Sequence, residues 1–189
     1  VSPNTVQSSF ETQFESNSLS TRNIANLKIA SEKFRLNVHA GFQNAADYQI
    51  PNGTFVVNSR FKGKSIKTSL GYNKDSWMVN LRYNHNSNQI GLPGHTHSAN
   101  PNPYDFQSSV QNRYRVVPFQ LISDHYLSLE NKIFFGNSVL KLLTGFTSNS
   151  LTEHEEKVTI PGIKMLLTNF PYHLSYTTHF NEDITWISG

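Results

Sequence analysis

Cysteine is absent from the 189-residue sequence, and charge is sparse at 15% of residues. Without cysteine the chain has no disulfide framework, no thiolate metal site and no cysteine nucleophile. No stretch approaches the roughly 18 consecutive apolar residues of a membrane-spanning helix, so any membrane role falls to strands. The net charge is only +3 and the basic residues occur singly, so we expect no nucleic-acid partner.

Sequence motifs of catalysis are missing as well. The chain has no nucleophile elbow, no glycine-rich phosphate loop and no zinc-protease helix. We therefore predict a protein that is not an enzyme and that has no cofactor or metal site. Hydrophobic residues make up only 37% of the chain, whereas aromatic residues reach 12%. This balance is typical of a membrane β-barrel, whose strands show an apolar face to lipid and a polar face to the lumen.

Alternation of apolar and polar residues recurs along the chain, and this is the pattern of β-strands. In the clearest segment Trp77, Val79, Leu81 and Tyr83 alternate with more polar residues. Helical spacing is nowhere sustained. We predict an all-β fold, an antiparallel up-and-down meander of about nine strands that forms a partial transmembrane β-barrel across residues 1–189. The other predicted strands fall within residues 6–15, 25–29, 34–43, 65–72, 120–130, 139–147, 163–168 and 172–178.

Connections between these strands alternate between short and long. Outer-membrane barrels have this asymmetry, with tight turns on the periplasmic side and long loops outside. The sequence predicts tight turns at residues 31–33, 73–76, 130–132 and 169–171. It predicts long loops at residues 44–63, 86–117 and 148–162.

Aromatic residues are expected near both ends of the strands, where a membrane barrel has its two interfacial girdles. The alternative explanation is that strands are rich in aromatic residues for any purpose. The residues expected beside the short turns are Phe34, Trp77, Phe135, Phe170 and Tyr172, and those expected at the opposite ends are Phe14, Phe42 and Tyr83.

Short sequence stretches occur in a characteristic order through nearly the whole chain. They are Asp47-Tyr48, Pro51-Asn52-Gly53, Asn58-Ser59-Arg60-Phe61, Leu70-Gly71-Tyr72, Gly91-Leu92-Pro93, Gln120, Asp124-His125, Leu129-Glu130-Asn131-Lys132, Asn137-Ser138 and Leu140-Lys141. In this order and spacing the chain resembles the TonB-dependent outer-membrane receptors, in particular the iron-complex type of Bacteroidetes-like bacteria.

The resemblance implies a barrel of about 22 strands around a plug domain. Such a receptor lies in outer-membrane lipid, is energised by the TonB complex through the plug, and imports a scarce nutrient such as a ferric siderophore. The sequence opens at Val1 with neither an initiator Met nor a signal segment. We therefore expect a fragment from the N-terminal half of the barrel, without the plug or the C-terminal strands.

Candidate ligand-binding residues cluster in the longest predicted loop. His95 and His97 lie one residue apart and could contact a metal complex or haem, although two histidines without a third ligand make a weak metal site. Tyr104, Arg113, Tyr114 and Arg115 combine aromatic rings with cations, which suits an anionic, partly aromatic ferric chelate. Both groups have an alternative explanation as ordinary loop residues. The acidic run at residues 153–156 is expected to be a solvated loop tip.

Cationic residues, most of which have the polar parity, are expected to line the lumen, where they would steer anions or pair with acidic groups of a plug. These residues are Arg35, Lys67, Arg82, Lys141 and Lys164. His125 shares its parity with Leu121, Leu127 and Leu129, and the sequence offers no reason for an imidazole on that side.

Two further interpretations remain open from the sequence. The first is a soluble all-β carbohydrate-binding module with Trp77 or Tyr104 as a stacking platform, which needs apolar faces that meet across a core of about 10 Å. The second is a metal-dependent hydrolase built on His95 and His97.

Overall fold

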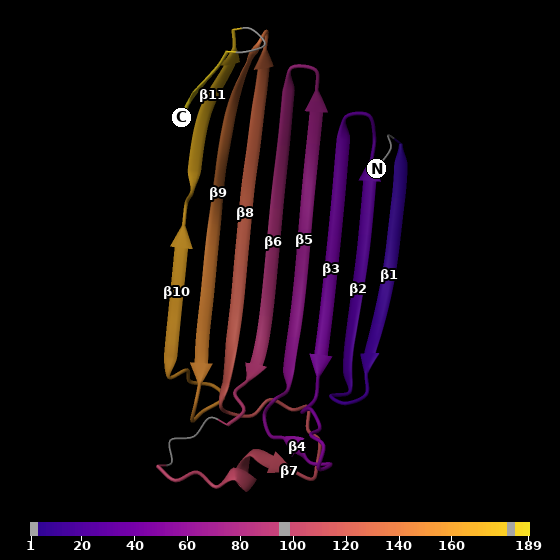
Figure 1. The fold of residues 1–189 in the computed structure, drawn as a ribbon, viewed down its shortest axis with the longest axis vertical. Coiled ribbons are helices and arrows are strands. Elements are labelled where there is room, and N and C mark those ends of the chain that lie inside the picture. Colours follow the sequence, from indigo (N-terminus) through magenta and orange to yellow (C-terminus); the bar gives the residue numbers. More distant parts are fainter. Residues whose placement is uncertain (1–3, 95–98, 181–183) are drawn as a thin grey trace.

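The computed structural model describes residues 4–94, 99–180 and 184–189, and the chain is all-β. Among these residues ten strands form one antiparallel sheet in which successive strands lie side by side (Figure 1). The predicted up-and-down meander is therefore confirmed. Its strands, in sheet order, are β1 (Thr5–Glu15), β2 (Ser20–Ala30), β3 (Phe34–Ala45), β5 (Phe61–Lys74), β6 (Trp77–Gly91), β8 (Phe119–Phe135), β9 (Ser138–His154), β11 (Tyr172–His179) and β12 (Thr185–Ser188), with β10 (Ile163–Asn169) also on β9.

Strands β10 and β11 are two halves of one interrupted strand. β10 pairs with residues 147–153 of β9, and β11 pairs with residues 138–144 of the same strand. Both run antiparallel to β9, so the chain does not reverse between them. Pro171 has no N–H to donate to the ladder, and its carbonyl instead accepts a hydrogen bond from the Gly145 N–H at 2.9 Å. The predicted tight turn at residues 169–171 is therefore wrong.

The hairpin between β8 and β9 lies at Gly136–Asn137, so the predicted turn at residues 130–132 is wrong. Three consecutive polar residues imitate a turn in the sequence, but here they continue the strand. The first and third of them point to the polar side of the sheet, while Asn131 accepts a hydrogen bond from Trp77 Nε1 at 2.6 Å. Gly136 has φ of 57°, a conformation that glycine adopts readily.

Two strands extend further into the predicted loops than the alternation indicates. β6 continues to Gly91 and β9 to His154, although loops were predicted from residues 86 and 148. In the last residues of these two strands, polar residues such as Ser87 and Ser150 lie on the side of the sheet that is apolar elsewhere. The two-residue pattern therefore disappears from the sequence while the backbone ladder continues.

Long connections gather at one end of the sheet, at the bottom of Figure 1. Residues 46–60, 92–118 and 155–162 all connect strands there, as predicted. The turns at residues 31–33, 75–76 and 136–137 lie at the opposite end, which we call the short-turn end. The connection at residues 16–19 is short but lies at the long-loop end.

Ladder register separates the strand residues into two faces. Leu36, Leu70, Leu81 and Leu129 lie opposite one another on successive strands and so share one side of the sheet. We call this side the apolar face. The intervening positions form the polar face, where the corresponding row across the same strands is Asn37, Ser69, Arg82 and Ser128.

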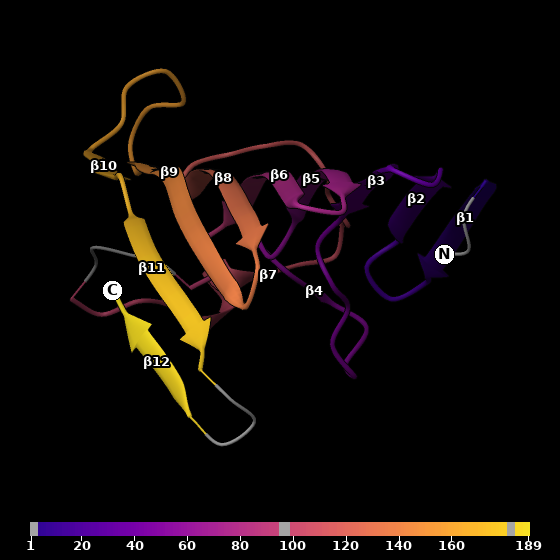
Figure 2. The same ribbon diagram turned by 90° about the horizontal axis from the view of Figure 1, so that it is seen from above.

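No second sheet or helix covers the apolar face in the described part of the chain, which forms a single curved layer (Figure 2). Leu70 is 47% exposed and Leu81 40% exposed. The buried hydrophobic residues among those described are only Ala30, Ala45, Ala46 and Phe119. The sheet is also open, because β1 and β12 are unpaired on their outer edges. The apolar side chains therefore form no internal core.

Aromatic rings do gather at the short-turn end of the apolar face. Phe34 lies 4.9 Å from Tyr72, and Tyr72 lies 5.5 Å from Trp77, between ring centroids. A second group consists of Phe135, Tyr176 and Trp186.

Three aromatic residues do not lie where the sequence placed them. Phe170 and Tyr172 flank the interruption between β10 and β11 rather than a turn, because the chain does not reverse there. Tyr83 lies in the middle of β6, opposite Leu127.

Candidate functional site

Two long connections pack together at the long-loop end of the sheet and form what we call the loop base, residues 46–60, 92–94 and 99–118. A short antiparallel pair, β4 (Phe55–Val56) and β7 (Gln107–Ser108), joins them. Next to it lies the short 3-10 helix η1 (Pro103–Phe106), where the Phe106 carbonyl accepts a hydrogen bond from the Val57 N–H at 2.9 Å. The β4–β7 pair lies on the concave side of the curved sheet (Figure 2).

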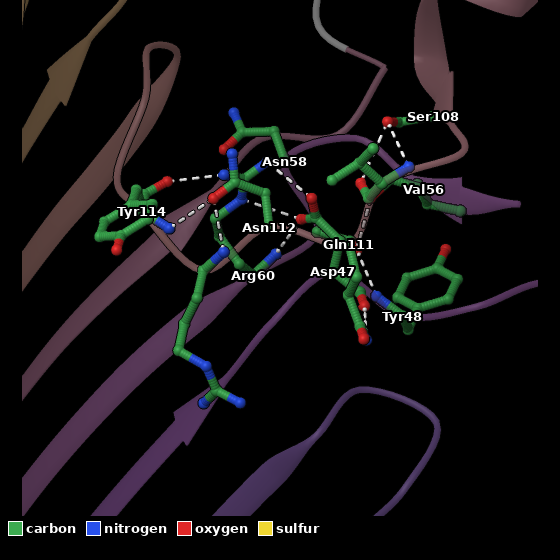
Figure 3. Close-up of polar contacts among 12 residues, drawn as sticks. Asp47, Tyr48, Val56, Asn58, Arg60, Ser108, Gln111, Asn112 and Tyr114 are labelled. Atoms are coloured by element: carbon green, nitrogen blue, oxygen red, sulfur yellow. Dashed lines mark hydrogen bonds and ion pairs between the residues drawn. The ribbon is translucent and has the colours of Figure 1, made fainter.

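A buried ion pair between Asp47 and Arg60 organises the loop base (Figure 3). Arg60 Nη2 lies 2.6 Å from Asp47 Oδ2, and Arg60 Nε lies 2.9 Å from Oδ1. This two-point geometry is the strong form of an arginine–carboxylate contact. Asp47 is 1% exposed and Arg60 4% exposed. Arg60 Nη1 also donates to the Tyr114 carbonyl at 2.6 Å, so one guanidinium connects both loops.

Asn58 and Gly91 make a second tight contact in the loop base. Asn58 has φ of 63°, and its side-chain Nδ2 donates to the Pro118 carbonyl. A Cβ atom on Gly91 would collide with the backbone oxygen of Asn58. Glycine is therefore required at the end of β6 for the first long connection to lie against it.

Gln111 and Asn112 complete the hydrogen-bonding of the loop base. Gln111 Nε2 donates to the carbonyl of Asp47 at 2.7 Å, and the backbone N–H of Asp47 donates to the carbonyl of Asn112 at 3.0 Å. Asn112 Oδ1 accepts from the Tyr114 N–H at 2.9 Å. No buried side-chain nitrogen or oxygen among the described residues lacks a hydrogen-bond partner. The loop base is thus held by satisfied polar contacts.

A cationic cavity of about 670 Å³ opens between the loop base and the ends of β3, β5 and β6. This volume is in the range of small-molecule sites. No acidic side chain lines the cavity, and the one carboxylate behind it, Asp47, is already paired with Arg60. An excess of positive charge is therefore available to an anionic ligand. The cations that line it are Arg60, Lys62, Arg113 and Arg115.

Three of the predicted ligand-binding residues lie together on this cavity: Arg113, Tyr114 and Arg115. The Arg113 guanidinium donates to the backbone carbonyls of Leu19 at 2.6 Å and Asn44 at 3.3 Å, so it also fastens the loop to the sheet. The Tyr114 residue is 82% exposed. The Arg115 guanidinium lies 4.9 Å from the centre of the Phe119 ring.

The other predicted ligand-binding residues are not part of this cavity. Tyr104 lies in η1 and is 80% exposed, away from the residues that line the cavity. His95 and His97 lie outside the described residues. The acidic run at 153–156 is only partly a loop, because it begins within β9. His154 is buried there and stacks on Phe119 at 4.5 Å, which corrects the expectation of a solvated tip.

Comparison with known proteins gives no identification. No family model, curated protein or solved structure matches the chain. The chemistry of the site therefore has to be argued from its own residues.

Four of the five predicted lumen-lining cations, including Lys141, lie on the polar face, whereas Lys164 lies opposite Thr152 on the apolar face. Arg35 is opposite Gly71, Lys67 is opposite Asn84, and Arg82 is opposite Ser128. Arg82 Nη2 lies 3.4 Å from Glu130 Oε2. Lys132 and Lys141 also contact the Glu130 carboxylate, at 3.3 and 3.5 Å. One acid thus faces three cations, and the cluster keeps an excess of positive charge.

His125 has partners that the sequence does not reveal. Its Nδ1 lies 2.9 Å from the Tyr83 hydroxyl, and its ring stacks on His85 at 4.2 Å between centroids. Both histidines lie on the apolar face, one row beyond Tyr83 and Leu127 toward the long loops. The next row contains Ser87 and Ser123. The imidazoles therefore lie at the border where the apolar face becomes polar.

The described residues contain neither a metal-binding cluster nor a membrane-spanning helix. No group of three or more His, Asp or Glu residues in that part of the chain is placed to hold a metal ion. None of its helical segments has the length and hydropathy to cross a membrane.

Residues that organise the site were largely missed from the sequence. Asp47, Asn58 and Arg60 are noticed there only as parts of the family resemblance. Gln111 and Asn112 carry no sequence signal at all, because exposed and buried amides in a polar loop look the same.

Proposed function

We propose that the chain is part of the barrel of a TonB-dependent receptor in a bacterial outer membrane. In this proposal the protein imports a scarce nutrient, a ferric siderophore or another iron complex, and catalyses no covalent change. The observation that carries the proposal is the uncovered apolar face. A row of leucines crosses the sheet at 40–47% exposure on Leu81 and Leu70, and a lipid environment removes the cost of exposing them to water.

The height of the apolar rows is close to, and somewhat less than, the ~25 Å apolar band of outer-membrane barrels. From Trp77 to His85, β6 advances about 26 Å at roughly 3.3 Å per residue, and a strand tilt near 40° reduces this to about 20 Å. The aromatic group of Phe34, Tyr72 and Trp77 marks one limit of this span. The stacked histidines His85 and His125 mark the other. Aromatic rings at a limit of the span agree with an interfacial girdle.

The cationic cavity supports an anionic ligand. Arg113 and Arg115 flank the exposed ring of Tyr114 at the long-loop end, which is the extracellular end in this proposal. Guanidinium groups bind carboxylates and other planar anions through paired hydrogen bonds. A ferric chelate with acidic or aromatic groups has the matching chemistry, and the cations of the polar face would attract it further along the lumen.

The carbohydrate-binding alternative requires a different arrangement. A soluble sandwich buries its apolar faces against a second sheet, and the described residues place no such layer on the apolar face. No observation on the loop base favours a sugar over an anion, because the exposed ring of Tyr114 lies between two arginines.

Membrane fractionation of the full-length protein tests the proposal. We expect recovery with the outer-membrane fraction and resistance to extraction by alkaline carbonate, because the apolar face would be held in lipid. A matched ligand test compares uptake of an iron complex by the wild type and by Arg115→Gln. Lys33→Gln is the control, because Lys33 is exposed in the turn at the short-turn end. Recovery in the soluble fraction without detergent would disprove the proposal.

A further inference from the structure

Acidic residues are distributed unequally between the two faces of the sheet. Within the described strands the apolar face carries no Asp or Glu at all, although lysines and histidines occur on it. Ladder register places every acidic strand residue on the polar face: Glu11, Glu15, Asp124, Glu130 and Glu153. The apolar face is therefore not merely uncharged, since it excludes one sign of charge.

Four exposed lysines lie on the apolar face, and two of them are neighbours on one strand. Lys62 and Lys64 are on β5, opposite Gln89 and Ser87. Lys62 also lines the cationic cavity, so the two sites adjoin. The two lysines are two residues apart on one side of a strand, so their Cα atoms are separated by about 7 Å. Both long side chains can therefore reach one small anion. In the described part of the chain, no carboxylate forms an ion pair with either lysine.

Hydrogen-bonding groups continue this level across the neighbouring strands. The row of Lys64 includes Ser87, Ser123 and Ser150, and the row of Lys62 includes Gln89 and Thr152. The ammonium group of Lys62 lies 5.7 Å from the centre of the Phe42 ring. This contact holds the lysine side chain against the sheet. Toward the short-turn end the next row contains Ile66, His85 and His125. A cationic, hydroxyl-rich belt thus borders directly on the apolar rows.

We propose that Lys62 and Lys64 bind the phosphate of an anionic lipid headgroup at the long-loop border of the apolar face. This inference rests on the proposed membrane location and adds the class of lipid. Lysine is a common phosphate ligand, and hydroxyl groups donate to the remaining phosphate oxygens. The acyl chains of the same lipid would lie along the apolar rows below. A molecule with an anionic head and apolar chains matches both adjoining surfaces.

The position of the belt also explains the missing acids. A carboxylate at this level would face the phosphate groups of the bilayer and be repelled, whereas a lysine is attracted to them. On the polar face, acids are tolerated because they meet the cations of the lumen wall, as Glu130 does.

Lipid binding by the full-length protein, purified in detergent, tests this site. The probes are dipalmitoyl phosphatidic acid and dipalmitoyl phosphatidylcholine, which share acyl chains and differ in the headgroup, and native mass spectrometry counts the bound lipid. We expect the wild type to prefer phosphatidic acid. We expect K64Q to weaken its binding about fivefold and K62Q/K64Q about twentyfold, because each lysine near an anionic lipid contributes on the order of a fivefold factor.

A charge-matched control separates this site from net charge. K28Q/K74Q removes the same number of charges, from the polar face and from the short-turn end of the apolar face, and should bind within about twofold of the wild type, because neither lysine is near the site. Equal losses in both double variants would overturn the proposal. So would equal binding of the two lipids by the wild type, or full displacement of the lipid by inorganic phosphate alone.

Two further outcomes distinguish the occupants and the underlying proposal. Loss of a dimer in K62Q/K64Q, without loss of phosphatidic acid binding, would assign the belt to a second copy of the chain and overturn the lipid site. A protein that fractionates with the membrane but shows no headgroup preference would reject the lipid site alone. A protein that is soluble without detergent would reject the membrane location as well.

Discussion

The strand wall and the loop base differ in what they bury. In the ten-stranded wall, leucines such as Leu70 and Leu81 are exposed, and backbone ladders join the strands. In the loop base, the charged side chains Asp47 and Arg60 are almost fully buried. A soluble protein would have the opposite arrangement, with apolar residues inside and charges outside.

The different surroundings of the strand wall and the loop base explain this contrast. A wall between lipid and an aqueous lumen has no interior of its own, so its apolar side chains face outward. A loop has few apolar residues with which to build a core, so it is ordered by hydrogen bonds and paired charges. An arginine–carboxylate ion pair is therefore expected to cost more to break in the loop base than in the strand wall, because burial removes the screening that water provides.

The largest effect is expected from Asp47→Ala in the loop base. The substitution leaves the buried Arg60 guanidinium without its carboxylate, which costs about 3–5 kcal/mol. Hydrogen exchange of the Arg60 N–H, which donates to Asp47 Oδ1 at 3.1 Å, should become much faster. Asp105→Ala is the control, because this exposed acid also lies in the loop base. Unchanged exchange in the Asp47 variant would show that the pair does not hold the loops.

A smaller effect is expected from a charge on the apolar face of the wall. Leu81→Arg places a guanidinium near the middle of the proposed bilayer, at a cost of about 2–4 kcal/mol. Asn80→Arg puts the same group on the polar face of the same strand, next to Glu130, and should cost little. Urea unfolding of the full-length protein in lipid vesicles measures both. Equal costs would mean that the two faces do not differ in environment.

The smallest effect is expected from the exposed ion pair of the wall. The Arg82 side chain is 44% exposed, so a double-mutant cycle of Arg82→Gln and Glu130→Gln should give a coupling of only about 0.2–1 kcal/mol. Glu130 also keeps its contacts with Lys132 and Lys141. The same cycle on Asp47 and Arg60 should give a coupling several times larger. A coupling above about 2 kcal/mol for Arg82 and Glu130 would remove the contrast between exposed and buried pairs.

Sequence reasoning was most successful where the signal is local. The alternation around Trp77, Val79 and Leu81 predicts a strand and also assigns each side chain to a face, because the side-chain period of a strand is two residues. Sequence reasoning fails where a polar stretch inside a strand imitates a turn, and where a strand continues without the alternation. The polar residues 130–132 imitate a turn but continue β8, and the mixed residues after Asn86 resemble a loop but continue β6.

The candidate site was predicted only in part. Arg113, Tyr114 and Arg115 follow one another in the chain, so their common location is a local property. The contact of Tyr114 with Arg60, 54 residues away, is not. Nor does any sequence pattern indicate that Asp47 faces inward rather than toward solvent.

The sequence by itself determined the strands, their up-and-down order and the identity of the two faces, because these follow from a two-residue period and from connection lengths. Only the tertiary structure decided the Asp47–Arg60 pair, the stacking of His85 on His125, and the continuation of β10 into β11 along β9. Each of these depends on which distant segments lie side by side. Which segments become neighbours depends on hydrogen bonding across the whole sheet, so it cannot be read from the residues of one segment alone.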